Sequence, residues 1–432
     1  MEVKPGGSLV MERREQILGA VETLNYRATV GDVATRSGLE LTTVQQELNS
    51  LAQDGDGHLQ VSNTGEIVYA FEADVRDRLL RKDRNARLKA LLKKAWQVAF
   101  YLVRISFGIL LVLSLLLIAI GIYVVLSSRD GDSGGEGESR GGGGGMPGFF
   151  WGNFFYIFYW PPYGYYEERR LKDPNDMGFL ESVYSFLFGD GNPNADLESR
   201  RWRTVAGLIQ ANRGVVVAEQ LAPYLEAARV DSEDFVLPAL VKYDGVPEVS
   251  EQGEIVYRFP QLQVQAEERR PAAPLPGFLQ EKRWQFSKAP GGKLVLAGAL
   301  GVANFVGAWF LYFLLQSTNL PPDLGFFAAL APVLVVYGTL FLLVPAVRAA
   351  VISWLNRGVE SRNRSRSGFS RHLREANAEL RRKLAFAQNF AGQKVLGKED
   401  IIYTTEQSTL EQRDYELDDP RFRSLEDPRT ER

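Results

Sequence analysis

A stretch of eleven residues occurs twice in this chain, and this repetition constrains the fold more than any other feature. Residues 61–71 read VSNTGEIVYAF and residues 249–259 read VSEQGEIVYRF, so eight of the eleven positions are identical. The same offset of 188 residues pairs apolar positions upstream of the match, namely Ile17 with Val205, Val21 with Ile209, Val33 with Leu221 and Leu48 with Val236. We therefore expect two copies of one small module.

The composition bounds both the number of domains and the chemistry. A chain of 432 residues is too long for a single core, so roughly two to four compact units are expected. With 50 Lys and Arg against 53 Asp and Glu, no overall field attracts nucleic acid. The sequence has no cysteine, and its two histidines, His58 and His372, are far apart. Disulfides, thiolate metal sites and cysteine-ligated iron–sulfur clusters are excluded, and no metal or cofactor is predicted.

The first copy carries the pattern of a small helical domain that ends in a β-hairpin. Apolar residues recur at helical spacing over residues 17–24, 30–36 and 44–51, which predicts three short helices. Residues 59–71 then alternate around a turn at residues 63–65, which predicts the hairpin. Three helices followed by a hairpin are the element order of a winged-helix domain.

Capping residues and one proline refine the expected helices. Thr29 is placed to cap the second helix, and the Asp32 carboxylate favours the positive helix start. Gly38 permits the left-handed turn that ends this helix. In the second copy Pro238 lies within the third helix and is expected to kink or shorten it, because proline removes a backbone donor and clashes with the preceding turn.

The charge of the third helices argues against DNA binding. A reading helix needs Arg, Lys, Asn or Gln at base edges, with further cations near the phosphates. Residues 40–54 contain three acids and no Lys or Arg, and residues 231–244 contain four acids and one lysine. We therefore expect both modules to be protein-docking domains or purely structural domains. The candidate docking residues are Gln45, Gln46, Glu47, Asn49, Glu233 and Asp234.

Long uncharged runs predict membrane spans. Residues 105–128 carry no charge over 24 residues, and at roughly 1.5 Å per residue this helix spans a hydrocarbon layer of roughly 30 Å. Residues 294–322 and 324–347 are also uncharged. They are separated by a short turn at residues 318–323, so they predict a helical hairpin.

Basic residues beside the spans predict orientation and lipid contact. No acid lies between Asp83 and the first span, and residues 348–383 hold ten Lys or Arg against three acids. By the positive-inside rule, both chain ends are expected on the cytoplasmic side. The candidate contacts to anionic lipid headgroups are Lys93, Lys94, Arg104, Arg348 and Arg357.

An aromatic segment is expected to return the chain across or into the bilayer. Three crossings cannot place both ends on one side, and twelve of the 18 residues in 149–166 are aromatic, a composition typical of the headgroup level. This segment is therefore interpreted as re-entrant or membrane-crossing. It follows a Gly-rich stretch that is expected to act as a flexible linker.

The predicted fold class is a mainly α membrane protein with two winged-helix (α+β) modules, one single transmembrane helix and one transmembrane helical hairpin. The predicted domains are a first winged helix at 1–82, a basic helix with the first span at 83–128, the Gly-rich linker at 129–147, the aromatic segment at 148–166, a second winged helix at 167–265, a Pro-rich linker at 266–293, the hairpin at 294–347, and a basic helix with an acidic tail at 348–432.

No constellation of residues predicts catalysis. The chain shows no serine elbow, no paired carboxylates in a span and no histidine beside a nucleophile. Asn304 is a polar residue within the second span. It is flanked by Gly298, Gly301 and Gly307, which favours helix packing, and a pathway lined by it is the alternative.

Three further stretches carry a family resemblance. Residues 185–194 (SFLFGDGNPN), residues 200–202 (RRW) and residues 215–225 (VVVAEQLAPYL) resemble an uncharacterised membrane protein family of cyanobacteria and plant plastids. Plant members are catalogued as iron–sulfur cluster biosynthesis family proteins. The resemblance implies an oxygenic phototroph and a thylakoid or plasma membrane, with no reaction established.

These features together predict a non-enzymatic membrane protein that presents two cytoplasmic winged helices to a protein partner. Assembly or maintenance of photosynthetic membrane complexes is the expected process, and the expected partners are an unidentified membrane or cytoplasmic protein and anionic lipids. A membrane-bound transcription regulator and a small transporter subunit are the alternatives. The sequence leaves the oligomeric state open.

Overall fold

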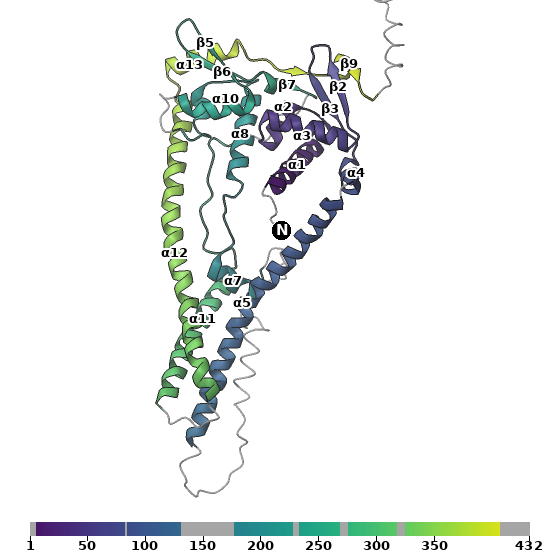
Figure 1. The fold of residues 1–432 in the computed structure, drawn as a ribbon. Helices are drawn as coiled ribbons and strands as arrows, with labels where there is room; N and C mark the ends of the chain where they lie inside the picture. The colour runs from purple at the N-terminus through teal and green to yellow at the C-terminus, as the bar shows by residue number, and fades with distance from the viewer. Residues whose placement is uncertain are drawn as a thin grey trace, which may run out of the picture. The chain divides into compact units, whose positions relative to one another are not determined.

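The structure is a computed structural model of the chain, and it describes residues 6–82, 84–130, 177–227, 233–267, 275–317 and 325–406. The chain forms two compact units, whose elements are labelled in Figure 1. The module unit comprises Met1–Ala90, Pro193–Arg283 and Gly358–Arg432. The helical unit comprises Leu91–Asn192 and Trp284–Arg357.

The first module contains the three helices and the hairpin that the sequence predicts. Its elements in chain order are α1 (Gly6–Thr23), β1 (Arg27–Thr29), α2 (Val30–Ser37), α3 (Leu41–Asp54), β2 (His58–Ser62) and β3 (Ile67–Ala70), with α4 (Val75–Lys82) after them. Strand β3 pairs antiparallel with both β1 and β2. The short strand β1 therefore extends the hairpin into a small sheet.

The ends of α2 are closed by the residues that the sequence indicated. The Thr29 hydroxyl accepts a hydrogen bond from the Asp32 N–H, and the Thr29 N–H donates to the Asp32 carboxylate, both at 3.1 Å. Gly38 ends the helix at φ +76°, and its N–H donates to the Ala34 carbonyl. Both predicted caps are confirmed, because they depend only on local chain chemistry.

The second module repeats this order with shorter helices. Its elements are α8 (Leu197–Ala211), β4 (Val215–Val216), α9 (Ala218–Leu221), the 3-10 helix η1 (Glu233–Val236), α10 (Leu237–Tyr243), β5 (Val246–Val249) and β6 (Ile255–Arg258), followed by the 3-10 helix η2 (Pro260–Leu262) and β7 (Val264–Gln265). Pro238 lies in the first turn of α10, after η1. The third helix is thus shortened as expected, since proline fits a helix start but not its interior.

The backbones of the two modules follow the same offset of 188 residues. His58 pairs with Ala70 on the first hairpin, and Val246 pairs with Arg258 on the second. Four of the five positions with positive φ in the first module also have positive φ at this offset in the second, namely Asn25 with Arg213, Tyr26 with Gly214, Asp56 with Asp244 and Gly65 with Gly253, whereas Gly38 has no such counterpart. Strand register and turn conformation therefore agree in both modules.

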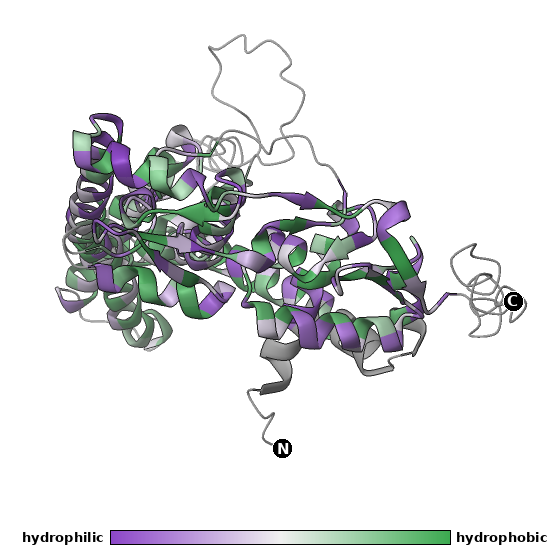
Figure 2. Ribbon diagram, turned by 90° about the horizontal axis from the view of Figure 1, so that it is seen from above, coloured by the Kyte–Doolittle hydropathy of each residue, from purple (hydrophilic) through white to green (hydrophobic). Residues whose placement is uncertain are grey.

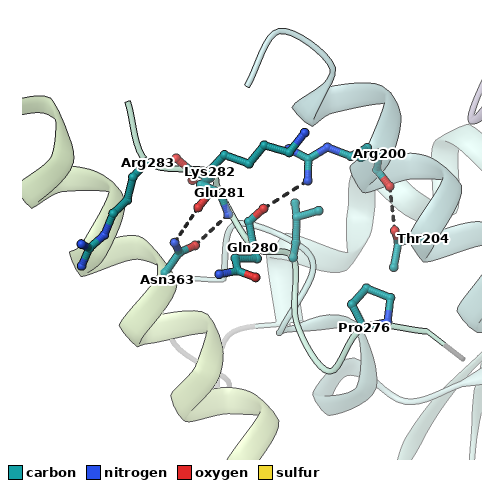
Figure 3. A pocket seen from close by; sticks show the side chains of 9 residues that line it. Arg200, Thr204, Pro276, Gln280, Glu281, Lys282, Arg283 and Asn363 are labelled. Carbon is teal, nitrogen blue, oxygen red and sulfur yellow. Dashed lines mark hydrogen bonds between the residues drawn. The ribbon is translucent and has the colours of Figure 1, made fainter. Parts of the chain in front are cut away.

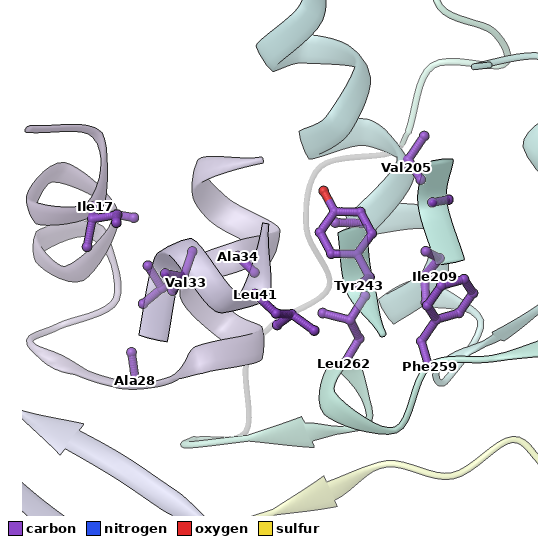
Figure 4. Packing of buried hydrophobic residues seen from close by; sticks show 14 of the residues in the cluster. Ile17, Ala28, Val33, Ala34, Leu41, Val205, Ile209, Tyr243, Phe259 and Leu262 are labelled. Atoms are coloured by element: carbon purple, nitrogen blue, oxygen red, sulfur yellow. The ribbon is translucent and has the colours of Figure 1, made fainter. Parts of the chain in front are cut away.

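One hydrophobic core serves both modules. Leu41 of the first module belongs to the same buried cluster as Tyr243 and Leu262, and Figure 4 shows these side chains facing one another. Helix α2 lies against α8 and η2. At this crossing a Cβ added to Gly31 would lie 2.0 Å from the Gln261 carbonyl oxygen, so the close approach requires glycine. Hydrophobic and hydrophilic residues are interspersed along the elements of this unit (Figure 2).

The last described elements contact both modules. They are α13 (Ala378–Gln388), β8 (Lys394–Val395), the 3-10 helix η4 (Lys398–Asp400) and β9 (Ile401–Thr404). Helix α13 packs on β4 and β6 through Leu380 and Ala387. Strand β8 pairs in parallel with β7, and β9 pairs with β2 to give a four-stranded sheet in the order β1-β3-β2-β9. The C-terminal segment is therefore part of the module unit.

The helical unit is built around apolar helices. Helices α5 (Arg84–Asp130), α11 (Gly291–Gln316) and α12 (Gly325–Arg374) are, within the described chain, three helices long and apolar enough to cross a membrane. Helix α5 packs with α11 and α12 through Ile118, Leu311 and Leu334. The shorter helix α7 (Phe179–Phe188) packs in a second cluster with Leu111 and Phe341.

Two expected boundaries differ from the structure. The predicted second domain starts at residue 167, yet α7 buries its apolar face in the helical unit, and the module unit resumes at Pro193. The predicted basic helix after the hairpin is not separate, because α12 continues through Pro345 to Arg374 and the break falls before α13, which Asn377 caps. The Gly-rich linker from residue 131, the aromatic segment and the tail after residue 406 lie outside the described residues.

Candidate functional site

The predicted docking residues of α3 lie on one exposed helix. Gln45, Gln46 and Asn49 are exposed, and Glu47 is half-buried. The Asn49 side-chain oxygen accepts a hydrogen bond of 2.7 Å from the Tyr69 hydroxyl. Burial raises the pKa of Tyr69 above its ordinary value, so its hydroxyl remains a donor at neutral pH. This bond ties the helix to the hairpin and fixes the position of its exposed face.

The predicted residues of the second module have different surroundings. Asp234 is exposed, whereas the Glu233 carboxylate accepts hydrogen bonds from the Tyr257 hydroxyl and from the Lys383 ammonium group of α13. Burial and the bond to Glu233 together raise the pKa of Tyr257. Glu233 therefore holds α13 on the second module. Its carboxylate already has two hydrogen-bond partners within the chain, unlike an exposed docking residue.

A groove joins the two modules beside α3. It has a volume of about 380 Å³, and it is lined by Thr42 and Gln45 of α3, by Ile67 and the hairpin turn of the first module, and by Val241, Lys242 and Asp244 of the second. The structure therefore brings Gln45 together with the end of α10. Gln46, Glu47, Asn49, Glu233 and Asp234 do not line this groove.

The groove combines an exposed apolar side chain with few charges. Val241 is 69% exposed although it lies in a helix that packs against the core. The charged residues lining the groove are Glu66, Lys242 and Asp244. The Lys242 ammonium group stands 4.9 Å above the Trp202 ring, and burial lowers the pKa of this lysine. Such a lining does not suit phosphates, which need clustered cations.

Val241 and Lys242 escaped the sequence argument for a physical reason. The docking residues predicted from the sequence are acids and amides, each assigned within a single module. The groove arises only because the two modules share one core, so that α10 ends beside α3. The signal that could have identified it is the apolar sequence Leu237-Pro238-Ala239-Leu240-Val241, which carries more apolar positions than one buried helix face accommodates.

The predicted lipid contacts divide into two kinds. Lys94 and Arg357 are exposed, whereas the Lys93 side chain lies outside what the structure describes. Arg104 forms an ion pair of 3.2 Å with Asp190, and Arg348 donates to the carbonyl oxygens of Ser185 at 3.2 Å and Phe186 at 2.8 Å. Within the helical unit, these two arginines therefore hold α7 and the residue Asp190 after it against α5 and α12.

The described residues contain no cluster of three or more potential metal-ligating side chains. Asn304 is fully buried and donates a hydrogen bond to the Ser114 hydroxyl, so it joins α11 to α5.

Comparison with known proteins identifies a chloroplast relative. The sequence is 36% identical over 455 residues to a protein of Arabidopsis thaliana with the printed name "Uncharacterized protein At5g03900, chloroplastic", and the match covers 98% of this chain and 86% of the relative. No family model matches the sequence, and no solved structure matches it.

Proposed function

The chain belongs to the family of the Arabidopsis chloroplast protein At5g03900, and we propose that it is a membrane protein without enzymatic activity that docks a protein partner through its module unit. The three long apolar helices α5, α11 and α12 support the membrane setting. The name of the relative supports a plastid-type membrane. The basic flanks of the spans support an orientation with both chain ends on the cytoplasmic or stromal side.

We interpret both modules as duplicated winged helices. Three helices precede a hairpin in each, and the 188-residue offset holds for strand register and for the turns with positive φ. In a winged helix that binds DNA, the third helix presents cations and amides to the groove. Here α10 instead exposes Leu237 and Val241, and α3 carries no Lys or Arg.

The docking proposal rests on the groove between the two modules. It places uncharged Gln45 and Thr42 opposite exposed Val241, and its two acids outnumber its one lysine. A partner segment with apolar and basic side chains would bury Val241 and pair with Glu66 and Asp244. Assembly or maintenance of photosynthetic membrane complexes, in a thylakoid or plasma membrane of a phototroph, is the process we propose for it.

Site-specific photocrosslinking in membranes of the host tests the docking groove. Benzoylphenylalanine introduced at Gln45 is expected to give discrete protein adducts, because Gln45 lines the groove. The same group at Gln53, an exposed residue of the same helix that does not line it, serves as the control. The adducts at Gln45 should disappear when Val241→Glu places a charge in the groove.

Three outcomes would contradict this proposal. Equal adducts at both positions would show nonspecific capture, and insensitivity to Val241→Glu would place the contact elsewhere. Salt-dependent capture of duplex DNA by the full chain in detergent would instead favour the transcription regulator.

A further inference from the structure

A second pocket opens in the module unit, away from the groove. It has a volume of about 440 Å³ and three walls (Figure 3). Arg200 and Thr204 come from α8, Asn363 comes from α12, and the third wall is the extended chain at residues 276–283. Figure 3 shows the Lys282 and Arg200 side chains on the same side of this chain segment.

The extended wall is held rigidly by side chains on both of its flanks. The Asn363 amide group accepts a hydrogen bond of 2.9 Å from the Glu281 N–H and donates one of 2.8 Å to the Glu281 carbonyl. Asn194 bonds the Lys282 backbone in the same double manner, at 2.8 and 2.7 Å. Arg200 donates to the Gln280 carbonyl at 3.2 Å. The backbone is thereby fixed, while the side chains of Lys282 and Arg283 remain exposed.

The one acid that lines this pocket is already neutralised. Glu281 is 4% exposed, and its two oxygens accept hydrogen bonds from Arg362 at 2.6 to 3.1 Å and from Arg366 at 2.7 Å. Burial alone would raise the pKa of Glu281, but the bonds and charges of the two arginines hold it below its usual value. Glu281 therefore stays ionised, but its charge is already balanced by Arg362 and Arg366. It cannot also neutralise the positive charges of Lys282, Arg283 and Arg200 at the opening of the pocket.

The balance of charge around the pocket is positive. Lys282 and Arg283 bring two cations from adjacent positions, and Arg200 adds a third. Arg200 is paired with Asp196 at 3.0 Å and Arg283 with Glu360 at 2.5 Å. With Arg362 and Arg366 counted, five cations stand against four carboxylates, namely the paired Glu281, Asp196 and Glu360 and also Glu226, whose charge acts on Arg362. An excess of positive charge remains at a fixed, concave surface.

We propose that this pocket binds a phosphate group. Guanidinium groups present planar forks of N–H donors that match phosphate oxygens, and the Lys282 ammonium group adds a mobile point charge. Pockets of about 300 to 1,000 Å³ accommodate small ligands, so the volume leaves room for a phosphate with a short substituent. The phosphate can belong to a free ion or to a lipid headgroup, since the recognising chemistry is the same.

Titration of the full chain in neutral detergent micelles tests this proposal. Inorganic phosphate is one probe, and dihexanoylphosphatidylglycerol below its critical micelle concentration is the other; both are followed by 31P NMR or calorimetry. The double variant Lys282→Gln with Arg283→Gln is expected to weaken saturable binding at least tenfold. Lys288→Gln is the matched control, because Lys288 is an exposed lysine that follows this segment in the chain but does not line the pocket.

The two probes separate the possible sources of the phosphate. Saturation by inorganic phosphate supports a free anion, and saturation by the lipid alone supports a headgroup. Absence of saturable binding by both probes would overturn the proposal, as would equal binding by the double variant and wild type. An unchanged thermal unfolding midpoint of the double variant establishes that any lost binding does not reflect unfolding.

Discussion

The N–H of Thr405 donates a hydrogen bond of 3.0 Å to the carbonyl of Leu59, and the Thr405 hydroxyl accepts one of 2.9 Å from the Leu59 N–H. This exchange holds the C-terminal chain at the outer edge of β2. The position equivalent to Leu59 in the second module, 188 residues later, is Pro247 in β5. Because proline has no N–H, β5 lacks this donor, and among the described residues β5 pairs with β6 only.

Leu59→Pro is expected to release β9 from the first module. The change copies the second module and removes the N–H that faces Thr405, whereas the N–H groups that face β3 belong to neighbouring residues. Hydrogen exchange of the full chain, followed by mass spectrometry, should show at least tenfold faster exchange at residues 401–405. Leu59→Ala is the control, since it trims the side chain but keeps the N–H. Equal protection in wild type and Leu59→Pro would show that this bond does not hold the strand.

Glu281 should make the stability of the module unit dependent on pH. The buried Arg366 guanidinium has its ion pair with Glu281, so Glu281→Ala is expected to destabilise the unit by about 3 to 5 kcal/mol, as for a broken buried pair. Because the folded state lowers the pKa of Glu281, its contribution is complete above the unfolded value of about 4.3 and is lost as the pH falls through the folded value.

Thermal unfolding in detergent between pH 6 and 3 checks this dependence. Wild type should lose more stability than Glu281→Gln over that interval, because the glutamine cannot titrate. Parallel curves for the two proteins would mean that Glu281 is not the titrating group responsible. Arg283→Gln is a useful control, since its partner Glu360 is 43% exposed and their surface pair should contribute about 1 kcal/mol or less.

Local signals in the sequence predicted local structure well. Thr29 and Gly38 close α2 as expected, because capping depends on residues within a few positions. The hairpin turn at Gly65 and the shortening of the third helix at Pro238 follow from the backbone limits of single residues. Such features need no knowledge of the remaining chain.

Features that join distant segments could not be predicted in the same way. The hydrogen bonds between Leu59 and Thr405 join residues that are 346 positions apart in the chain. A sequence that predicts an extended β9 does not show that β9 pairs with β2. The sequence predicts Gln45 as a docking residue, but the groove that it lines also contains Val241, and α10 lies beside α3 only because the two modules share one core. Helix α12 also runs beyond its apolar part to Arg374, and the helix-weakening residues Pro345, Gly358 and Gly368 along the way do not end it.

Asn304 is expected to contribute to helix packing. It donates to the Ser114 hydroxyl, and a Cβ added to Gly338 would lie 3.0 Å from its side-chain oxygen, so the helices approach closely around it. Asn304→Ala should lower the stability of the helical unit by about 0.6 to 2 kcal/mol, the range for hydrogen bonds between membrane helices. Val302→Ala, at a half-exposed position of the same helix, is the control for thermal unfolding in detergent. A loss of ion or solute flux in vesicles without any change in stability would favour the transporter alternative.

Gly214→Ala should destabilise the second module more than Gly253→Ala. Both glycines have positive φ, at +79° and +81°, so alanine introduces backbone strain of about 1 to 2 kcal/mol at either position. At Gly253 a Cβ would meet no atom within 4 Å, but at Gly214 it would lie 2.1 Å from the Gln263 side chain. Gln263 would have to move, and its hydrogen bonds of 3.1 Å to the Arg213 carbonyl and 2.9 Å to the Phe390 carbonyl would be lost.

The expected difference between these two glycine variants is about 1 to 3 kcal/mol, because two hydrogen bonds are broken in one variant only. Chemical unfolding in detergent measures the difference, and hydrogen exchange around residue 390 reports whether the Gln263 contact has opened. Tyr26 occupies the equivalent position of the first module at φ +62°, so a side chain can be accommodated on this backbone where no glutamine crosses it. Replacing Gln263 with alanine in the Gly214→Ala background should therefore relieve the clash and leave only the strain. Equal destabilisation of both single glycine variants would show that the Gln263 contact contributes nothing.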